Sequence, residues 1–270
     1  MSLIYGLKHL FVKNYSIMID QNIGRLRLKV YGGIDELPSE RYNKFNIYCL
    51  LRAGIGNDAE SIATHIQDLA AAIGKNDTDR AMVQLNNYYH ALNMILNHED
   101  TQSMAFACLV HSINGVEITD ISEEGLRWIV SRIARAEKRV QAVQLFDLLK
   151  KKIEDEIEEY FPERVNESRI SMYYNYLNKY NRLKYKKLLG EGVEKEITKV
   201  EEEFYLRSKP VSYGGTGGLL LKLEKDYETN CLLLQQNGAH NPEKTPILKF
   251  YQLIELIHKQ KDNGKHKERK

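Results

Sequence analysis

The pattern of apolar and polar positions changes from a period of two to a helical period early in the chain. Residues 16–31 alternate, so that Leu26, Leu28 and Val30 share one face and basic residues share the other. This alternation predicts a half-exposed strand, the second arm of a hairpin that turns at residues 22–24. Beyond the next turn, apolar residues recur every three or four positions, which is typical of amphipathic helices.

Four helical segments follow the predicted hairpin. Ser39 is a candidate N-cap of the first segment, and Gly54 is its C-terminal stop signal. The four segments span residues 39–54, 57–74, 77–97 and 101–113. After them, the stretch NGVEITDIS predicts a turn and a short strand that can pair with the first hairpin. We therefore expect a small N-terminal β element and a four-helix core.

The longest apolar stripe in the sequence runs from residue 122 to 160, and no proline interrupts it before Pro162. It predicts one nearly continuous helix of roughly 55–60 Å. An exposed rod of this length needs partner helices for its stripe. Residues 168–189 and 193–208 are the natural candidates, folding back on it as a hairpin.

The C-terminal part restarts after four glycines within residues 214–218, and two further helices are expected there. The sequence thus predicts a mainly α protein, a helical bundle with a long helical hairpin and a small N-terminal β element. The expected segments are 1–120 (β element and four-helix core), 121–208 (long hairpin), 209–218 (glycine-rich linker), 219–260 (two-helix unit) and 261–270 (disordered basic tail).

Composition narrows the class of protein. The 270 residues are 43% apolar and 28% charged, which is typical of a folded globular chain. No apolar run approaches the ~20 residues of a membrane span, so we expect no membrane partner. The first residues are predicted to be part of the mature protein and not a signal peptide. Cys49, Cys108 and Cys231 are far apart, which predicts buried free thiols in a reducing compartment.

Two glycine-containing stretches resemble anion-binding loops. The stretch SYGGTGG, residues 212–218, lacks the lysine and hydroxyl of a P-loop and the third glycine of a dinucleotide turn, so a flexible linker is favoured. A loop that becomes ordered on contact with a partner chain remains an alternative. The stretch RAGIGND, residues 52–58, opens onto a helix N-terminus that can bind an anion, but a tight helix–helix connection explains it better.

Cys108 and His111 lie one helical turn apart in the predicted helix 101–113, which is the spacing of half a zinc site. No second Cys/His pair has a matching spacing, although His90 and His98 lie on the neighbouring predicted helix. A buried thiol and a core histidine are favoured. The sequence shows no catalytic motif, so we expect neither enzymatic activity nor a cofactor or metal.

The basic segment 169–189 is the strongest candidate site, because lysines, arginines and tyrosines alternate there without an acidic residue. Such residues can neutralise phosphates and stack on bases. The candidate nucleic-acid-binding residues are Arg169, Tyr173, Lys179, Arg182, Lys184, Lys186 and Lys187. Acidic segments flank this helix on both sides, so its counter-ions can instead come from its own hairpin.

Two blocks of the sequence resemble known proteins. The stretches LPSERYNKFNIYCLLRAGIGNDAESIATHI and QSMAFACLVHSI are similar to helical accessory proteins encoded among the structural and assembly genes of tailed bacteriophages. The end, CLLLQQNGAHNPEKTPILKFYQLIELI, is similar to the short helical units of tail assembly chaperones. The resemblance rests on packing and capping patterns, covers about a third of the chain and brings no catalytic residues. The long middle hairpin departs from the size of a small chaperone.

The resemblance implies a non-enzymatic protein-interaction factor, a structural or assembly (tail or virion) protein of a bacteriophage. It would bind other protein subunits, itself or phage structural proteins, in the host cytoplasm or in the virion. The candidate protein-interaction residues are Leu219, Leu223, Ile247, Phe250, Ile254 and Ile257. The alternative function is a nucleic-acid-binding accessory protein that acts through residues 169–187.

Overall fold

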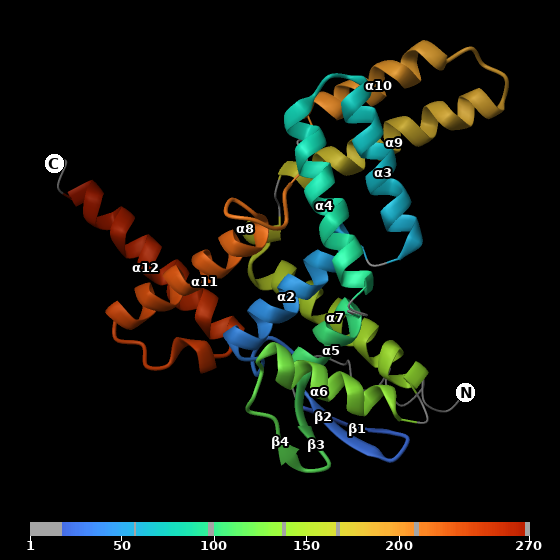
Figure 1. The fold of residues 1–270 in the computed structure, drawn as a ribbon. Coiled ribbons are helices and arrows are strands. Elements are labelled where there is room, and N and C mark those ends of the chain that lie inside the picture. Colours follow the sequence, from blue (N-terminus) through green and yellow to red (C-terminus); the bar gives the residue numbers. More distant parts are fainter. Residues whose placement is uncertain are drawn as a thin grey trace. The chain divides into compact units, whose positions relative to one another are not determined.

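The computed structural model describes residues 18–56, 58–96, 100–136, 139–165, 168–207 and 211–267. The described chain is mainly helical, and an antiparallel sheet of four strands in the order β1-β2-β3-β4 lies in its N-terminal half (Figure 1). This confirms the predicted fold class, mainly α with a small N-terminal β element.

The chain divides into two compact units, each built from separate stretches of sequence. Unit 1 comprises Met1–Asn46, Ser103–Glu156 and Thr229–Lys270, and unit 2 comprises Ile47–Gln102 and Ile157–Glu228. The boundaries fall inside helices α2 (Ser39–Gly54), α5 (Thr101–Leu109), α7 (Arg139–Tyr160) and α11 (Leu219–Gln236). The units therefore differ from the consecutive segments expected from the sequence, and the four predicted N-terminal helices do not share one core.

The first hairpin agrees with the alternating pattern. Strands β1 (Ile19–Ile23) and β2 (Leu26–Val30) are antiparallel, and Gly24 in the turn between them has a positive φ of 59°. Leu28 and Val30 are fully buried, whereas Arg27 and Lys29, which alternate with them, are exposed. One face of the hairpin therefore contributes to the core of unit 1.

The predicted helix 101–113 is wrong over its last four residues. Helix α5 ends at Leu109, and strands β3 (Val110–Ile113) and β4 (Val116–Glu117) follow directly. Asn114 and Gly115 both have positive φ, 53° and 83°, which a two-residue hairpin turn requires. The strand also gains backbone partners on β2, which an isolated helix end does not have.

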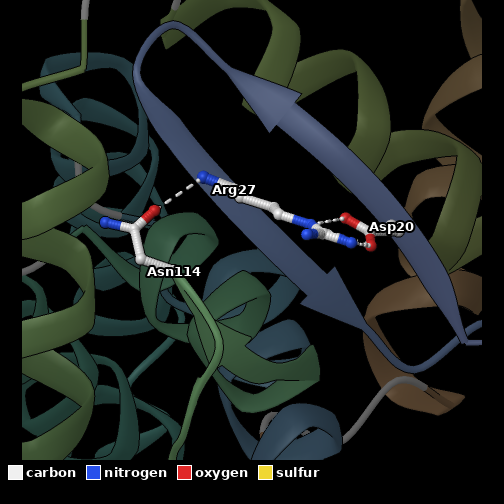
Figure 2. Close-up of polar contacts among 3 residues, drawn as sticks. All are labelled: Asp20, Arg27 and Asn114. Atoms are coloured by element: carbon white, nitrogen blue, oxygen red, sulfur yellow. Dashed lines mark hydrogen bonds and ion pairs between the residues drawn. The ribbon is translucent and has the colours of Figure 1, made fainter.

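Asn114 also links the β3–β4 hairpin to the β1–β2 hairpin by hydrogen bonds (Figure 2). Its backbone N–H donates to the Arg27 carbonyl at 2.7 Å, and its side-chain oxygen accepts from the Arg27 backbone N–H at 2.9 Å. The Arg27 guanidinium lies along the strands and donates to both carboxylate oxygens of Asp20, with Nε at 3.0 Å from each. This hydrogen bonding holds the pKa of Asp20 below its usual value.

The single long helix predicted for residues 122–160 is also wrong. Helix α6 (Glu123–Ala134) ends with Arg135 as its C-cap, and α7 begins at Arg139. The buried stripe of α6 ends at Ile133, and that of α7 begins at Ala142. Nine residues are about two and a half turns, so one straight helix would place the two stripes on opposite faces. Separate helices let each stripe be buried.

Two segments of unit 1 that are far apart in the sequence, residues 34–39 and 242–248, contact each other. We call this set of contacts the terminal clasp. Ser39 N donates to the Thr245 carbonyl at 2.9 Å, and its hydroxyl donates to the Pro242 carbonyl at 2.8 Å. Ile247 N donates to the Leu37 carbonyl at 2.9 Å. The short 3-10 helix η1 (Pro242–Lys244) and the start of α12 (Ile247–Lys267) are thereby fixed to the turn before α2.

The C-terminal segment is consequently part of unit 1 and not a separate two-helix unit. Four apolar residues of α12 are at most 7% exposed: Ile247, Phe250, Ile254 and Ile257. Helix α12 continues to Lys267, so the helix replaces the tail that was expected to be disordered from residue 261.

A buried arginine organises the change from helix to strand in unit 1. Arg41, in the first turn of α2, is only 5% exposed. Its Nη1 donates to the carbonyls of Cys108 at 3.2 Å and Val110 at 2.9 Å, and its Nη2 donates to the carbonyl of Ile118. The guanidinium also lies 5.5 Å from the ring centroid of Tyr31. One side chain thus holds the end of α5, the start of β3 and the segment after β4.

Unit 2 contains two helical hairpins. The first pairs α3 (Ala59–Gly74) with α4 (Thr78–Leu96), and the second pairs α9 (Ser168–Leu188) with α10 (Glu194–Arg207) (Figure 1). A short helix, α8 (Pro162–Val165), precedes α9. The second hairpin encloses a core of Leu183, Val193, Ile197 and Val200. Helices α9 and α10 therefore pack on each other.

Tyr205 of α10 joins the two hairpins of unit 2. Lys75 Nζ and Arg80 Cζ lie 3.7 and 3.6 Å from the centroid of its ring. Arg80 Nη1 donates to the Tyr205 carbonyl at 2.5 Å, and the Tyr205 hydroxyl donates to Asp77 Oδ2 at 3.2 Å. The connection between α3 and α4 therefore holds the end of α10.

The described part of the glycine-rich segment, residues 211–218, is a closed turn and not an open linker. The side chain of Asn87 on α4 donates to the Val211 carbonyl at 2.9 Å and accepts from Tyr213 N at 3.2 Å. The amides of residues 218–220 all donate to carbonyls within the turn, at 2.8 to 3.2 Å. Because these amides are already used, they cannot cradle a phosphate as P-loop amides do.

We expect Arg41→Met to lower the free energy of unfolding of unit 1 by about 2 kcal/mol, because buried carbonyls lose charged donors. Trp128 is the sole tryptophan and lies on α6 of unit 1, so its fluorescence during urea unfolding reports on this unit. Lys151→Met, at an exposed position of α7, is the control and should change stability by less than about 0.5 kcal/mol. Equal midpoints for both variants would contradict the role of Arg41.

Gly54 and Gly74 end α2 and α3 and form a matched pair for a second test. A Cβ at Gly54 would lie 1.5 Å from the Tyr213 hydroxyl, whereas a Cβ at Gly74 would meet nothing within 4 Å. We expect Gly54→Ala to destabilise by roughly 1–3 kcal/mol and Gly74→Ala to be neutral or stabilising. Urea unfolding followed by far-UV circular dichroism measures both.

Adding Tyr213→Ala to Gly54→Ala tests the cause. The double variant should cost less than the sum of the two single variants, because the steric conflict disappears once the ring is removed. Strict additivity would show that the Tyr213 ring does not limit residue 54.

Candidate functional site

The predicted basic segment lines a groove between α9 and α10, which we call the basic groove. It has a volume of about 490 Å³, and its lining residues are Lys179, Arg182, Leu183, Lys186, Glu196, Lys199 and Val200. Leu183 and Val200 are buried, so the floor of the groove is apolar. Four cations and one carboxylate line it, which makes the groove suitable for an anionic ligand.

The candidate residues on α9 fall on different sides of the helix. Lys179, Arg182 and Lys186 are three and four residues apart and line the basic groove. Lys184 and Lys187 do not line it. Lys184 Nζ lies 5.1 Å from the centroid of the Tyr180 ring, and its hydrogen bond to that residue raises the pKa of the lysine. The side chains of Arg169 and Tyr173 lie outside the part that the structure describes.

Counter-ions within the hairpin account for part of the basic charge. Three ion pairs join lysines to acidic residues, with N–O distances of 3.3 to 3.5 Å: Lys179–Glu203, Lys186–Glu191 and Lys187–Glu194. Among the described side chains, neither Arg182 nor Lys199 forms an ion pair. The internal-counter-ion hypothesis therefore applies to three lysines, and two groove cations are left for a ligand.

The aromatic residues of the hairpin are engaged with one another. Tyr176 stacks on Phe204 at 3.8 Å between ring centroids and on Tyr180 at 5.6 Å. Tyr176 and Tyr180 also pack against the hairpin core. Neither tyrosine lines the basic groove, so the interleaved pattern of basic and aromatic residues does not make a base-stacking surface there.

A second candidate surface lies on α4 and is apolar. We call it the α4 outer face: Met82, Leu85, Tyr89 and Leu96, with exposed fractions of 53, 44, 64 and 66%. At about 100° per residue, these positions lie nearly opposite the buried positions Gln84, Asn87, Ala91 and Met94. The helix is therefore apolar on the side away from its own packing contacts, as expected for a helix that has a further partner.

The outer face was not identified from sequence, although the signal was present. Leu85 belongs to an apolar series with helical spacing, yet it is 44% exposed. The buried face instead contains the polar residues Gln84 and Asn87, of which Asn87 binds the glycine-rich turn. The sequence signal for this exposed face is that α4 has more apolar positions than one helix face can hold.

The predicted protein-interaction residues do not form one exposed surface. Leu219 and Leu223, near the start of α11, are half-buried in unit 2. The other four, Ile247, Phe250, Ile254 and Ile257, belong to the core of unit 1. Docking of a partner on these four side chains would require unit 1 to open.

Cys108 and His111 are not on one helix, because α5 ends between them. Cys108 Sγ donates to the Met104 carbonyl at 3.3 Å within α5. His111 lies on β3, where its ring contacts Tyr31 edge-on and its Nε2 lies 3.7 Å from Glu117 Oε1. Burial lowers the pKa of His111. No group of three or more potential metal ligands comes together among the described residues.

The thiols agree in part with the prediction of buried free cysteines. Cys108 and Cys231 are buried, whereas Cys49 is only half-buried, and none of the three forms a disulfide.

Comparison with protein-family models, curated proteins and solved structures finds no significant match for this chain. Within the described residues, no helix has both the length and the apolar content that crossing a membrane requires.

Proposed function

We propose that this chain is a non-enzymatic protein-interaction factor that self-associates through the α4 outer face and acts in bacteriophage structure or assembly. The exposed apolar face supports the interaction role, and the sequence resemblance to helical proteins of tailed phages supports the setting. On this proposal the protein acts in the host cytoplasm or within the virion, in contact with other structural subunits.

The observation that carries the proposal is the contiguous exposure of large apolar side chains on one helix. Monomeric proteins rarely expose large contiguous apolar patches, and such patches commonly mark protein interfaces. Methionine and tyrosine, two of the three residue types on this face, are enriched in interfaces. Leaving Met82, Leu85, Tyr89 and Leu96 in water is unfavourable, because each buried methylene contributes about 0.8 kcal/mol.

A second copy of the chain fits this face better than a charged partner. Positions 82, 85, 89, 92 and 96 follow the alternating three- and four-residue spacing of a coiled-coil seam. From Ala81 to Leu96 the helix contains no lysine, arginine, aspartate or glutamate. Two copies can therefore pair this face around a two-fold axis without like-charge repulsion.

We expect Leu85→Gln/Tyr89→Gln to weaken self-association. In a two-fold pair each substitution acts twice, so the dissociation constant should rise by at least about tenfold. Light scattering after size-exclusion chromatography, over a range of concentrations, measures the mass against the 31.4 kDa of one chain. Val140→Gln, which removes a side chain that is 70% exposed on α7, is the matched control and should leave the mass unchanged.

A chain that stays monomeric at every concentration would contradict the proposed pairing. An oligomer that Leu85→Gln/Tyr89→Gln leaves intact would place the interface elsewhere.

A further inference from the structure

We infer that the basic groove between α9 and α10 is a second binding site, for the sugar–phosphate backbone of a nucleic acid. The groove lies on the α9–α10 hairpin, whereas the α4 outer face lies on the α3–α4 hairpin, and the two share no residue. The inference therefore does not depend on the proposed self-association. The inference rests on the position of the cations in the groove, which the sequence pattern alone does not reveal.

The groove presents its cations in a line. Lys179, Arg182 and Lys186 follow one side of α9 over seven residues, or about 10 Å of helix axis. Each strand of a DNA duplex carries a phosphate about every 3.4 Å of the helix axis, so this line of cations is long enough to contact more than one phosphate of a strand. Lys199 faces this line from α10 and adds a fourth cation on the other wall.

The cations of the groove are available to a ligand. Arg182 and Lys199 form no ion pair among the described side chains, and an arginine can bind a phosphate through two parallel hydrogen bonds. Lys179 and Lys186 pair with Glu203 and Glu191 at exposed positions. Exposed pairs contribute only about 0–1 kcal/mol each, so a phosphate can replace these carboxylates at little cost.

The same geometry indicates binding without sequence preference. Tyr176 and Tyr180 stack within the hairpin, and no aromatic residue is among the described residues that line the groove, so the lining offers no platform for bases. Phosphate contacts position a nucleic acid but do not read its sequence. A concave groove with a buried apolar floor suits a strand that lies along it better than it suits a flat lipid surface.

The test compares two pairs of substitutions that remove the same charge from the same hairpin. Arg182→Gln/Lys199→Gln removes groove cations, whereas Lys184→Gln/Lys187→Gln removes cations that do not line the groove. The probe is a fluorescent oligothymidylate about 20 nucleotides long, and its anisotropy is measured with the full chain from ~50 to ~200 mM salt.

We expect salt-sensitive binding by the unmodified chain, with a slope of log affinity against log salt of roughly −0.7 for each phosphate contact. Arg182→Gln/Lys199→Gln should weaken binding roughly tenfold and flatten the slope by about 1.4, whereas Lys184→Gln/Lys187→Gln should change affinity less than about threefold. Circular dichroism checks that both variants keep the helix content of the unmodified chain. Leu85→Gln/Tyr89→Gln should bind the probe normally.

Three results would overturn the inference. They are no binding at ~50 mM salt, an equal loss in both charge pairs, and a slope that Arg182→Gln/Lys199→Gln does not change. Inositol hexakisphosphate and vesicles containing phosphatidylserine are competitors that separate the phosphate sources. Displacement of the probe by either one at a lower phosphate concentration than unlabelled oligothymidylate requires would assign the groove to that ligand instead.

Discussion

The terminal clasp is the constraint on which the arrangement of the chain depends. Its hydrogen bonds join residues 34–39 to residues 242–248, about two hundred positions along the chain. The entropic cost of closing a loop grows only with the logarithm of its length, so a few backbone bonds and a buried α12 stripe can offset it. Once the clasp is formed, the C-terminal segment completes the core of unit 1, and two stretches between the clasp segments, residues 47–102 and 157–228, leave unit 1 and return to it. Each crossing between units occurs within a helix, at α2, α5, α7 and α11. Helices carry no glycine- or proline-rich signal at such a point, and composition therefore could not show where the units divide.

Local features of the fold could be predicted where neighbouring residues alone determine them. The alternation around Leu28 and Val30 identified the first hairpin, because a strand with one buried face has a period of two whatever it later packs against.

The strand at Val110 was missed, although Asn114–Gly115 between β-branched residues is a strong hairpin signal. There the apolar run from Met104 to Ile113 fits a buried helix and a buried strand equally well. The choice is made by contacts distant in sequence, namely the backbone of β2 and the guanidinium of Arg41. A buried arginine of this kind has no local signature, since an isolated basic residue near a helix start is normally exposed.

The error over residues 122–160 has a different cause. The absence of proline and the presence of frequent apolar residues are necessary for a long helix, but they do not ensure that the apolar residues share one face. The stripes ending at Ile133 and starting at Ala142 are half a turn out of phase. The angular position of an apolar stripe around the helix axis therefore contains information that a count of apolar residues does not. This angular position can be calculated from the sequence. The same consideration applies to α4, where an exposed apolar face and a buried face of mixed polarity lie on opposite sides of one helix.

The angular position of residues around a helix also explains why the sequence located the candidate site on the chain but did not show which of its cations line the groove. Charge composition located the basic residues of α9, and the acidic segment that follows α9 supplies the three ion pairs within the hairpin. Whether a given lysine lines the groove depends on which side of α9 it occupies relative to α10, and that follows from the packing of Leu183 with Val193, Ile197 and Val200. The apolar core of the hairpin thereby sets the direction of every cation on it. Because that core turns Lys179, Arg182 and Lys186 toward Lys199, it gathers in one groove part of the positive charge that α9 carries on several sides.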